Sequence, residues 1–336
     1  MKYIFKELLF FIYLILGRLK YYVLARDQEA IFYFDKALEL KPYRGDVFFN
    51  RGNAKYFCHY FEDAIKDFDN AIELGFKHKD LYLNRGNSNE ELGKLNDALL
   101  DFNKAIEFAP KYKSAYYNRG RINYSLKDFN GALKDYNKAI ALGYHKAKVY
   151  LNRGLVKTAL GQYNDAILDY DYAIERNSKY AIAYSHRAIA KLKIESYSEA
   201  IEDYTNAINL GENNELNYVN RGVAKHKIKQ FTEAIEDYSN AINLGYNNET
   251  VYFYRGLAKA ALELFQDALL DFNKIVELDP MNTEAFLCCS KCKYELKQYV
   301  DALKDINIAL KWDPNNEKLL EFRKIINDAK GDKNES

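Results

Sequence analysis

A period of 34 residues runs through nearly the whole chain, and no insertion breaks it. In one unit, Gly154 is followed twelve positions later by Ala166 and then by Ala173. The small residue and the first alanine recur as Gly52, Gly86, Gly120, Gly154, Ala188, Gly222, Gly256 and Ser290, and as Ala64, Ala98, Ala132, Ala166, Ala200, Ala234, Ala268 and Ala302. Isolated helices of about 14 residues are marginal in water. The pattern therefore predicts closely packed helical hairpins that bury their apolar faces by stacking on one another.

A 34-residue unit with small residues at these places resembles the tetratricopeptide (TPR) repeat, which is a pair of antiparallel helices joined by a short turn. The resemblance implies an all-α, right-handed superhelical solenoid of about nine hairpins, followed by a capping helix over 317–330. An apolar extension (1–10) is expected before the array (11–316), and a disordered tail (331–336) after it. The expected repeats are 11–44, 45–78, 79–112, 113–146, 147–180, 181–214, 215–248, 249–282 and 283–316.

The composition argues against several classes of function. The chain has 49 Lys and Arg residues against 48 Asp and Glu residues, so it lacks the basic footprint of a nucleic-acid-binding protein. A helical-repeat reader of RNA is therefore disfavoured. Aromatic residues make up 15% of the chain, and most occupy three columns of the repeat, typified by Tyr150, Tyr163 and Tyr170. Core packing explains these columns better than a stacking site does.

No pattern in the sequence indicates catalysis. Four cysteines are too few for a disulfide framework, which indicates a reducing compartment such as the cytoplasm. Cys289 and Cys292 form a C-x-x-C, but no second pair completes a tetrahedral metal site. A structural role is favoured for them over redox or metal chemistry. No phosphate-binding loop or nucleophile elbow is present, so we expect neither an enzyme nor a cofactor or metal.

The N-terminal segment allows two interpretations. Its uninterrupted apolar run, from Leu8 to Leu16, is too short to span a bilayer. Ala30, Phe34 and Ala37 match the second helix of a repeat, so residues from about 11 to 24 would form the first helix of repeat one. Alternatively, residues 1–25 are a secretory signal or attach the protein to a membrane. The expected location is cytoplasmic, with membrane association or export as the alternative.

Three charged columns depart from the TPR pattern, which places apolar or aromatic residues there. The first is the arginine just before the small residue, the second is a lysine four residues later in several repeats (Lys157, Lys191, Lys225 and Lys259), and the third is an aspartate sixteen residues after the arginine. Because these columns are charged as a set, we predict ion pairs between arginine and aspartate within each repeat; the alternative is that the arginines face a ligand. Asp305, opposite Cys289, would have no arginine. The predicted pairs are Arg51 with Asp67, Arg85 with Asp101, Arg119 with Asp135, Arg153 with Asp169, Arg187 with Asp203, Arg221 with Asp237, and Arg255 with Asp271.

The resemblance also implies that the first helices line a concave groove. An asparagine column there, Asn50, Asn84, Asn118, Asn152 and Asn220, resembles the asparagine ladder of TPR superhelices that hold extended peptides. An amide offers both a donor and an acceptor to a peptide unit. Alternatively, asparagine merely suits the local packing. Neighbouring candidates for peptide contact are Asn53, Asn87, Leu151, Leu155, Ile189, Val219, Val223, Phe253 and Leu257.

Together these features predict a non-enzymatic scaffold that binds a peptide or helix of a partner protein in the concave groove. The apolar members of the set would form a strip for the partner, unless the N-terminal segment of the chain covers it. The alternative is a membrane-associated assembly or secretion accessory factor, anchored by the N-terminal apolar segment. The sequence does not indicate an oligomeric state or the identity of the partner.

Overall fold

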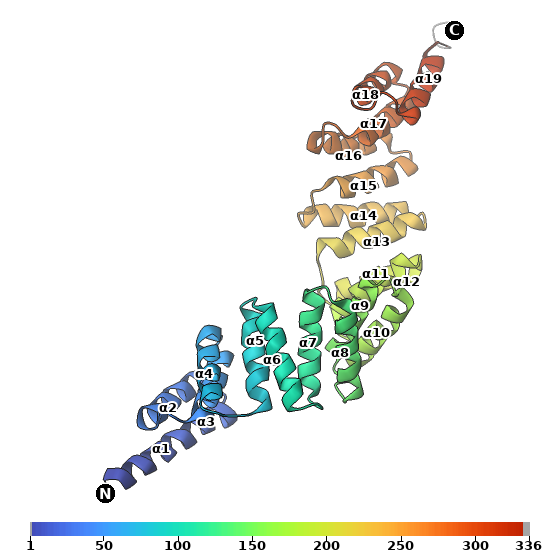
Figure 1. Ribbon diagram of the computed structural model, residues 1–336. Helices are drawn as coiled ribbons and strands as arrows, with labels where there is room; N and C mark the ends of the chain where they lie inside the picture. Colours follow the sequence, from blue (N-terminus) through green and yellow to red (C-terminus); the bar gives the residue numbers. More distant parts are fainter. Residues whose placement is uncertain (1, 332–336) are drawn as a thin grey trace. The chain divides into compact units, whose positions relative to one another are not determined.

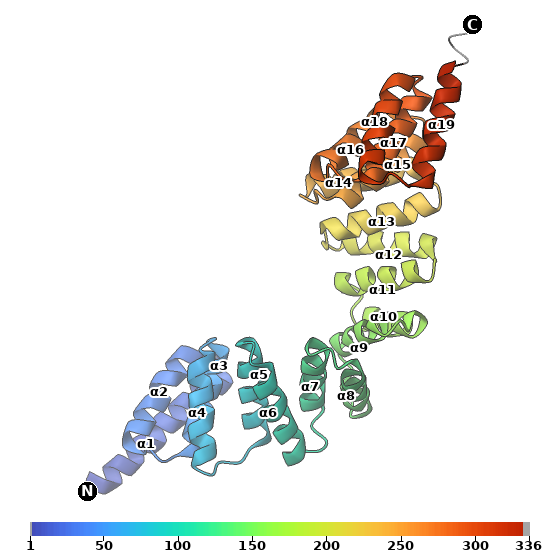
Figure 2. The ribbon, with the colours of Figure 1, turned by 45° about the horizontal axis from the view of Figure 1, so that its top comes forward.

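The computed structural model describes residues 2–331, and every regular element in that range is a helix. The chain divides into two compact units, Met1–Gln162 and Tyr163–Ser336, and each is described by itself. Within both units, helices that follow one another in the chain lie side by side as antiparallel neighbours (Figures 1 and 2). The structure is therefore an all-α stack of hairpins.

Unit 1 contains four hairpins and one further first helix. Its elements are α1 (Lys2–Arg18), the π-helical turn η1 (Leu19–Val23), α2 (Asp27–Leu40), α3 (Gly45–Phe57), α4 (Phe61–Glu73), α5 (Lys79–Glu91), α6 (Leu95–Phe108), α7 (Lys113–Ser125), α8 (Phe129–Ala141) and α9 (Ala147–Ala159).

Unit 2 begins with the second helix of a repeat and continues with four hairpins and a last helix. Its elements are α10 (Tyr163–Arg176), α11 (Ala181–Lys193), α12 (Tyr197–Asn209), α13 (Glu215–Lys227), α14 (Phe231–Asn243), α15 (Glu249–Ala261), α16 (Phe265–Leu278), α17 (Thr283–Glu295), α18 (Tyr299–Trp312) and α19 (Glu317–Gly331).

Small residues set the distance between the helices of a hairpin. A Cβ atom added to Gly222 in α13 would lie 2.7 Å from Cε1 of Tyr238 in α14. Ala234 and Ala241, one turn on either side of Tyr238, are fully buried. The tyrosine ring therefore fills the space that the glycine leaves open, and the column of small residues follows from this contact.

A residue in the left-handed conformation ends the first helix of each repeat. In seven repeats it is not glycine, as with Lys229, whose φ is 63°. Its equivalents are Ala25, His59, Gly93, Lys127, Gly161, Glu195, Glu263 and Lys297. L-residues pay roughly 1–2 kcal/mol for this conformation, so the packing of the two helices imposes the tight turn.

The first helices form the inner layer of each unit. In unit 1, α3, α5, α7 and α9 contact one another in succession, and in unit 2, α11, α13 and α15 do the same. We call the surface that these helices and α17 present the first-helix face. It is the surface on which the sequence places the candidate contacts to a partner.

The N-terminal helix is longer than the sequence predicts. We expected an extension over 1–10 and a helix over about 11–24, but α1 runs from Lys2 to Arg18. No Gly or Pro interrupts residues 2–16, and Phe10 and Leu14 are buried against Phe34 of α2. Core contacts therefore reach back into the expected extension and hold it in the helix.

The two ends of the described chain differ in polarity. At the C-terminal end, α19 buries Leu319 and Ile326 and turns mostly polar residues outward. At the N-terminal end, α1 exposes Ile4, Leu8 and Ile15 by 71, 58 and 63%. Within residues 2–331, no helix has the length and apolar content that crossing a bilayer requires. The predicted tail, from residue 332 on, lies outside the described residues.

Candidate functional site

The arginine and aspartate columns meet within the repeat. Arg221 in α13 donates from Nε and Nη2 to the Asp237 carboxylate in α14, at 3.0 and 2.6 Å. Only 1% of Asp237 is exposed, so this is a buried, two-pronged ion pair. The same geometry joins Arg51 to Asp67, Arg85 to Asp101, Arg119 to Asp135, Arg187 to Asp203, and Arg255 to Asp271. Arg153 and Asp169 lie in different units, and their pairing stays a prediction.

In the repeats that lie within one unit, a second donor contacts the buried aspartate. Lys225, one turn after Arg221, places its Nζ 2.8 Å from Asp237. In two repeats an asparagine amide takes this place, as with Asn123 at 3.0 Å from Asp135. Residues equivalent to Lys225 that contact their aspartate are Lys55, Asn89, Asn123, Lys191, Lys259 and Lys293.

Asp305 is the aspartate of the column that stands opposite Cys289 in place of an arginine. Its cationic partner is Lys293, whose Nζ lies 2.6 Å from the carboxylate. The lysine stands one turn further along α17 on the same helix face, so it reaches the carboxylate without the arginine. Burial still raises the pKa of Asp305, and Lys293 opposes the rise.

The arginines also contact the preceding repeat, a contact that the sequence did not predict. Nη1 of Arg221 donates to Oγ1 of Thr205 in α12, at 3.1 Å, and Arg255 contacts Ser239 in the same way at 3.1 Å. Each such arginine thus makes a bidentate contact with the aspartate of its own repeat and a third hydrogen bond to the preceding repeat. We call this set of three bonds the arginine staple. The remaining acceptors are Asp35, Asp69, Asn103, Asn137 and Asp171.

An aromatic ring lies beside each guanidinium. Arg221 is 5.5 Å from the centre of the Tyr218 ring, three residues earlier on the same helix. The other six arginines of the column lie 5.3 to 5.9 Å from their rings. With their donors bonded and one flat side over a ring, these arginines hold the stack together and offer a ligand little. The i, i+3 spacing of aromatic and arginine was the signal in the sequence.

Four of the five asparagines of the column, Asn50, Asn84, Asn118 and Asn152, are bonded inside the protein. Asn84 donates to Oδ1 of Asn53 at 2.9 Å, and Asn152 donates to the Tyr117 hydroxyl at 3.1 Å. Asn50 accepts from Tyr22 at 3.0 Å. Asn118 likewise donates to Asn87, at 2.7 Å. These amides therefore join neighbouring repeats.

Two of the asparagines offer no surface. Asn50 and Asn53 are only 4% exposed, which corrects the expectation that they contact a partner. The reason is that the ring of Tyr22 from η1 and the amide of Asn84 cover them. Asn84, Asn87, Asn118, Asn152 and Asn220 are half-buried, so part of each amide remains accessible.

The apolar candidates for contact with a partner likewise divide into buried and half-buried residues. Leu151 and Val219 are each 5% exposed, so they belong to the core, and the expectation that they line an open strip is wrong for them. The next repeat packs over this position: Val219 lies in one cluster with Ala241 and Val251. The half-buried members are Leu155, Ile189, Val223, Phe253 and Leu257.

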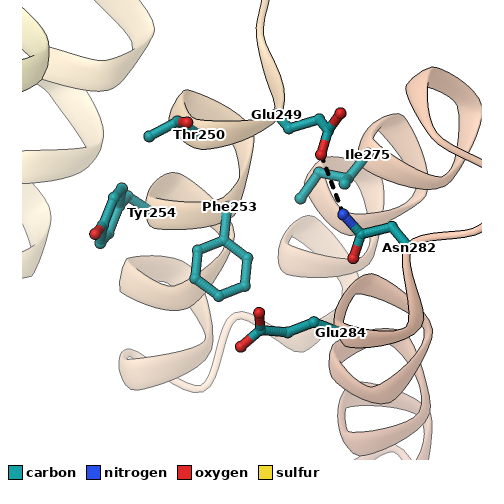
Figure 3. Close-up of a pocket in the computed structure, with 7 residues that line it drawn as sticks. All are labelled: Glu249, Thr250, Phe253, Tyr254, Ile275, Asn282 and Glu284. Carbon is teal, nitrogen blue, oxygen red and sulfur yellow. Dashed lines mark hydrogen bonds between the residues drawn. The ribbon is translucent and has the colours of Figure 1, made fainter. Parts of the chain in front are cut away.

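A pocket of about 250 Å³ opens on the first-helix face of unit 2 (Figure 3). Its floor includes Ile275 of α16 and Phe253 of α15, whose ring packs edge-on against Phe272. Two exposed carboxylates stand on its rim, Glu249 at the start of α15 and Glu284 at the start of α17. Thr250, Tyr254 and Asn282 complete the lining. The site thus combines an aromatic surface with negative charge.

The cysteines of the C-x-x-C are held as thiols. Burial raises the pKa of Cys289 to about 12 and that of Cys292 to about 11. A thiol with so high a pKa is a poor nucleophile and a poor metal ligand at neutral pH. Within the described residues, no group of three or more His, Cys, Asp or Glu side chains could hold a metal ion.

Comparison with known proteins identifies the repeat. Sequence models of the tetratricopeptide repeat match residues 49–113, 114–144 and 151–214. This chain contains tetratricopeptide repeats. Its TPR units account for the hairpins, the small residues and the 34-residue period. No curated protein sequence matches the chain.

Solved TPR structures share the fold at low sequence identity. The C-terminal part of a TPR repeat-containing protein from Cytophaga hutchinsonii is 19% identical, with a TM-score of 0.60 over 70% of this chain and 97% of that one. A tetratricopeptide repeat protein from Parabacteroides merdae is 20% identical, with a TM-score of 0.54 over 74% and 98%. YrrB, described as a TPR protein with an unusual peptide-binding site, is 24% identical, with a TM-score of 0.53 over 56% and 97%.

Proposed function

We propose that this TPR protein is a non-enzymatic scaffold whose first-helix face binds a peptide or helix of a partner protein. The proposal is supported by which side chains remain available for a partner. The arginine and aspartate columns are consumed by internal bonds, whereas the first-helix face keeps half-buried amides and apolar side chains, such as Asn84 and Leu155, and an open pocket at Phe253. YrrB, which shares the fold, is described as having a peptide-binding site.

Micromolar binding of a peptide would require several contacts at once. One amide–backbone hydrogen bond contributes about 0.5–1.5 kcal/mol net, whereas micromolar affinity corresponds to about −8.2 kcal/mol. Asn84 and Asn118 already donate one N–H each to an asparagine of the preceding repeat. They therefore contribute orientation along the face, and the apolar side chains and pockets select the segment.

The test is selection of peptides by the intact chain from a random display library, followed by hydrogen–deuterium exchange with and without a selected peptide. We expect new protection in first helices such as α5, α7, α11 and α13. The second helices α6, α8, α12 and α14 should be unchanged and serve as the internal control. Failure to select any peptide, or protection confined to the second helices, would overturn the proposal.

A second role is favoured by the outward face of α1. Ile4, Leu8, Ile12 and Ile15 follow one another at helical spacing and are exposed. The first 26 residues carry five basic side chains and a single carboxylate, Glu7. An apolar helix face flanked by positive charge and tyrosines suits the interface of an anionic bilayer. We propose that α1 lies in such an interface and makes the scaffold membrane-associated.

Vesicle flotation tests this second role. The full chain should float with vesicles that contain anionic lipid and less with neutral ones, and added salt should weaken the association. The triple variant Ile4→Ser, Leu8→Ser and Ile15→Ser should stay in solution while its circular dichroism is unchanged. Equal flotation of variant and wild type contradicts the role, as does a wild type that forms dimers through this face and ignores vesicles.

A further inference from the structure

The pocket of unit 2 has an unbalanced negative charge. Glu249 accepts a hydrogen bond from Nδ2 of Asn282 at 3.1 Å, and Figure 3 shows Phe253 between the side chains of Glu249 and Glu284. Among the described residues, neither carboxylate has a cation within ion-pair distance. The pocket therefore holds two carboxylates that no cation of the described chain neutralises, and a cationic group of a ligand would balance their charge.

Unit 1 shows what fits at the same place in the repeat. Phe253 corresponds to Tyr117, and Glu284 corresponds to Lys148, at a shift of four repeats. In unit 1, Nζ of Lys148 lies 4.7 Å from the centre of the Tyr117 ring. The fold therefore accommodates an ammonium over this aromatic position. In unit 2 the ring remains, but the residue that would cover it has the opposite charge.

A simpler explanation accounts for only part of the site. Glu249 and Glu284 lie in the first turns of α15 and α17, where negative charge is favourable in any helix. That explains the carboxylates. It does not explain why they border an aromatic ring and an open volume of about 250 Å³, or why unit 1 fills the equivalent place with its own lysine.

We propose that this pocket binds a lysine or arginine side chain of the partner peptide. The cationic group lies beside the carboxylates of Glu249 and Glu284, and the aliphatic stem lies over Phe253, a combination of charge pairing and cation–π attraction. The proposal rests on the peptide-binding function above and adds a chemical preference at one position of the ligand.

The experiment measures the pocket without needing the natural peptide. The full chain is labelled with 4-fluorophenylalanine, and the Phe253 signal in the ¹⁹F spectrum is assigned by Phe253→Leu. The probe is N-acetyl-arginine amide, and N-acetyl-citrulline amide is its neutral isostere. We expect the arginine probe to shift the Phe253 signal saturably at millimolar concentration. It should bind at least about fivefold more tightly than citrulline, since each exposed ion pair is worth about one- to fivefold.

Two charge-reversal variants complete the design. Glu284→Lys installs the residue type found at Lys148 and should cover the ring with the protein's own ammonium, which abolishes the arginine-induced shift. Glu236→Lys, on the exposed side of α14, makes the same change in net charge and should leave the shift intact. Equal binding of the two probes, or an arginine shift that survives Glu284→Lys, would overturn the pocket assignment.

The outcomes for the pocket and for the scaffold are separable. If library peptides bind the chain but show no basic residue at a fixed position, the pocket assignment fails and the scaffold function stands. If the arginine probe shifts the Phe253 signal while no peptide is selected, the pocket is supported and the scaffold function fails.

Discussion

Asp237 is gripped by Arg221 through two hydrogen bonds, at 3.0 and 2.6 Å, although its carboxylate is almost wholly withdrawn from water. Burying a carboxylate is costly unless it is paired and fully hydrogen-bonded. Lys225 supplies the additional donor. The aspartate therefore depends on two cations of the same repeat, and the repeats differ in whether the second donor is charged.

Removal of the arginine should destabilise the protein more where the second donor to the aspartate is neutral. Arg119 is the cation that pairs with Asp135, so Arg119→Leu leaves this carboxylate with the Asn123 amide, and we expect a loss of roughly 3–5 kcal/mol. Arg221→Leu leaves Lys225 in place and should cost roughly 1.5–3 kcal/mol. Urea denaturation followed by circular dichroism measures both. Equal losses would show that the lysine contributes nothing.

Removing the carboxylate together with the arginine should recover stability. The double variant Arg119→Leu, Asp135→Leu leaves no buried charge, and it is expected to be closer to wild type than Arg119→Leu alone. Strictly additive losses in the double-mutant cycle would mean that the two side chains do not act as a pair.

The repeat that lacks the arginine can be stabilised by restoring it. Cys289→Arg would place a guanidinium near Asp305 and Asn273, which already lies 3.5 Å from the Cys289 sulfur. Phe286 provides the ring three residues earlier. We expect the variant to be stabilised by about 1–2 kcal/mol, the value of a hydrogen bond to a charged group. Cys288→Arg, at the neighbouring position, is the control and should not stabilise the chain.

Acidification should destabilise unit 2 through His186. Burial lowers the pKa of this histidine, opposed by Glu212, and its ring stacks on Tyr170. Because the folded pKa lies below the unfolded value of about 6.5, the unfolded chain binds the proton more readily. The contribution is complete above that value and is lost as the pH falls through the folded pKa.

His186→Asn tests this, since asparagine occupies the equivalent position at Asn152 and Asn220. The variant should lose less stability than wild type between pH 7.5 and 5.5, as measured by urea midpoints. His59→Asn, at an exposed turn, is the matched control and should follow the wild type. A wild-type slope in His186→Asn would exclude the histidine as the cause.

Replacing a left-handed turn residue by glycine should also stabilise the protein. Lys229, with a φ of 63°, should be replaceable by glycine with a stabilisation of roughly 1 kcal/mol, because the strain of a side chain in this conformation is removed. Thermal melting measures the change. Gly161→Ala, at the same position of another repeat, should have the opposite sign. A loss of stability in Lys229→Gly would mean that unfolded-state entropy outweighs the strain.

The sequence was sufficient for the all-α stack of hairpins and for the approach of Arg221 to Asp237, because a strict period and columns that change together are local and regular signals. It was not sufficient for the contact of Arg221 with Thr205. Chemically mixed residues fill that column, so no single residue type marks it. The acceptors of the staple were therefore overlooked.

Other misses have a geometric cause. Helical periodicity places Leu151 and Leu155 on one face, but it does not say how closely the next repeat packs, which buries Leu151. Lys6 and Glu7 interrupt the apolar pattern of α1, although Glu7 is paired with Lys41 at 2.5 Å. Glu249 and Glu284 belong to different repeats, and only folding brings them to one pocket.

The third bond of the arginine staple also bears on how such a chain grows. The position that accepts it holds Asp, Asn, Thr or Ser in every repeat from Asp35 to Asn273, so each unit ends with an oxygen ready for the arginine of whichever unit comes next. Recombination that gains or loses 34 residues in frame would thus create a junction already supplied with its bond. Duplication of such units needs no matching change in the neighbour, and the length of the array can drift while its joints stay intact.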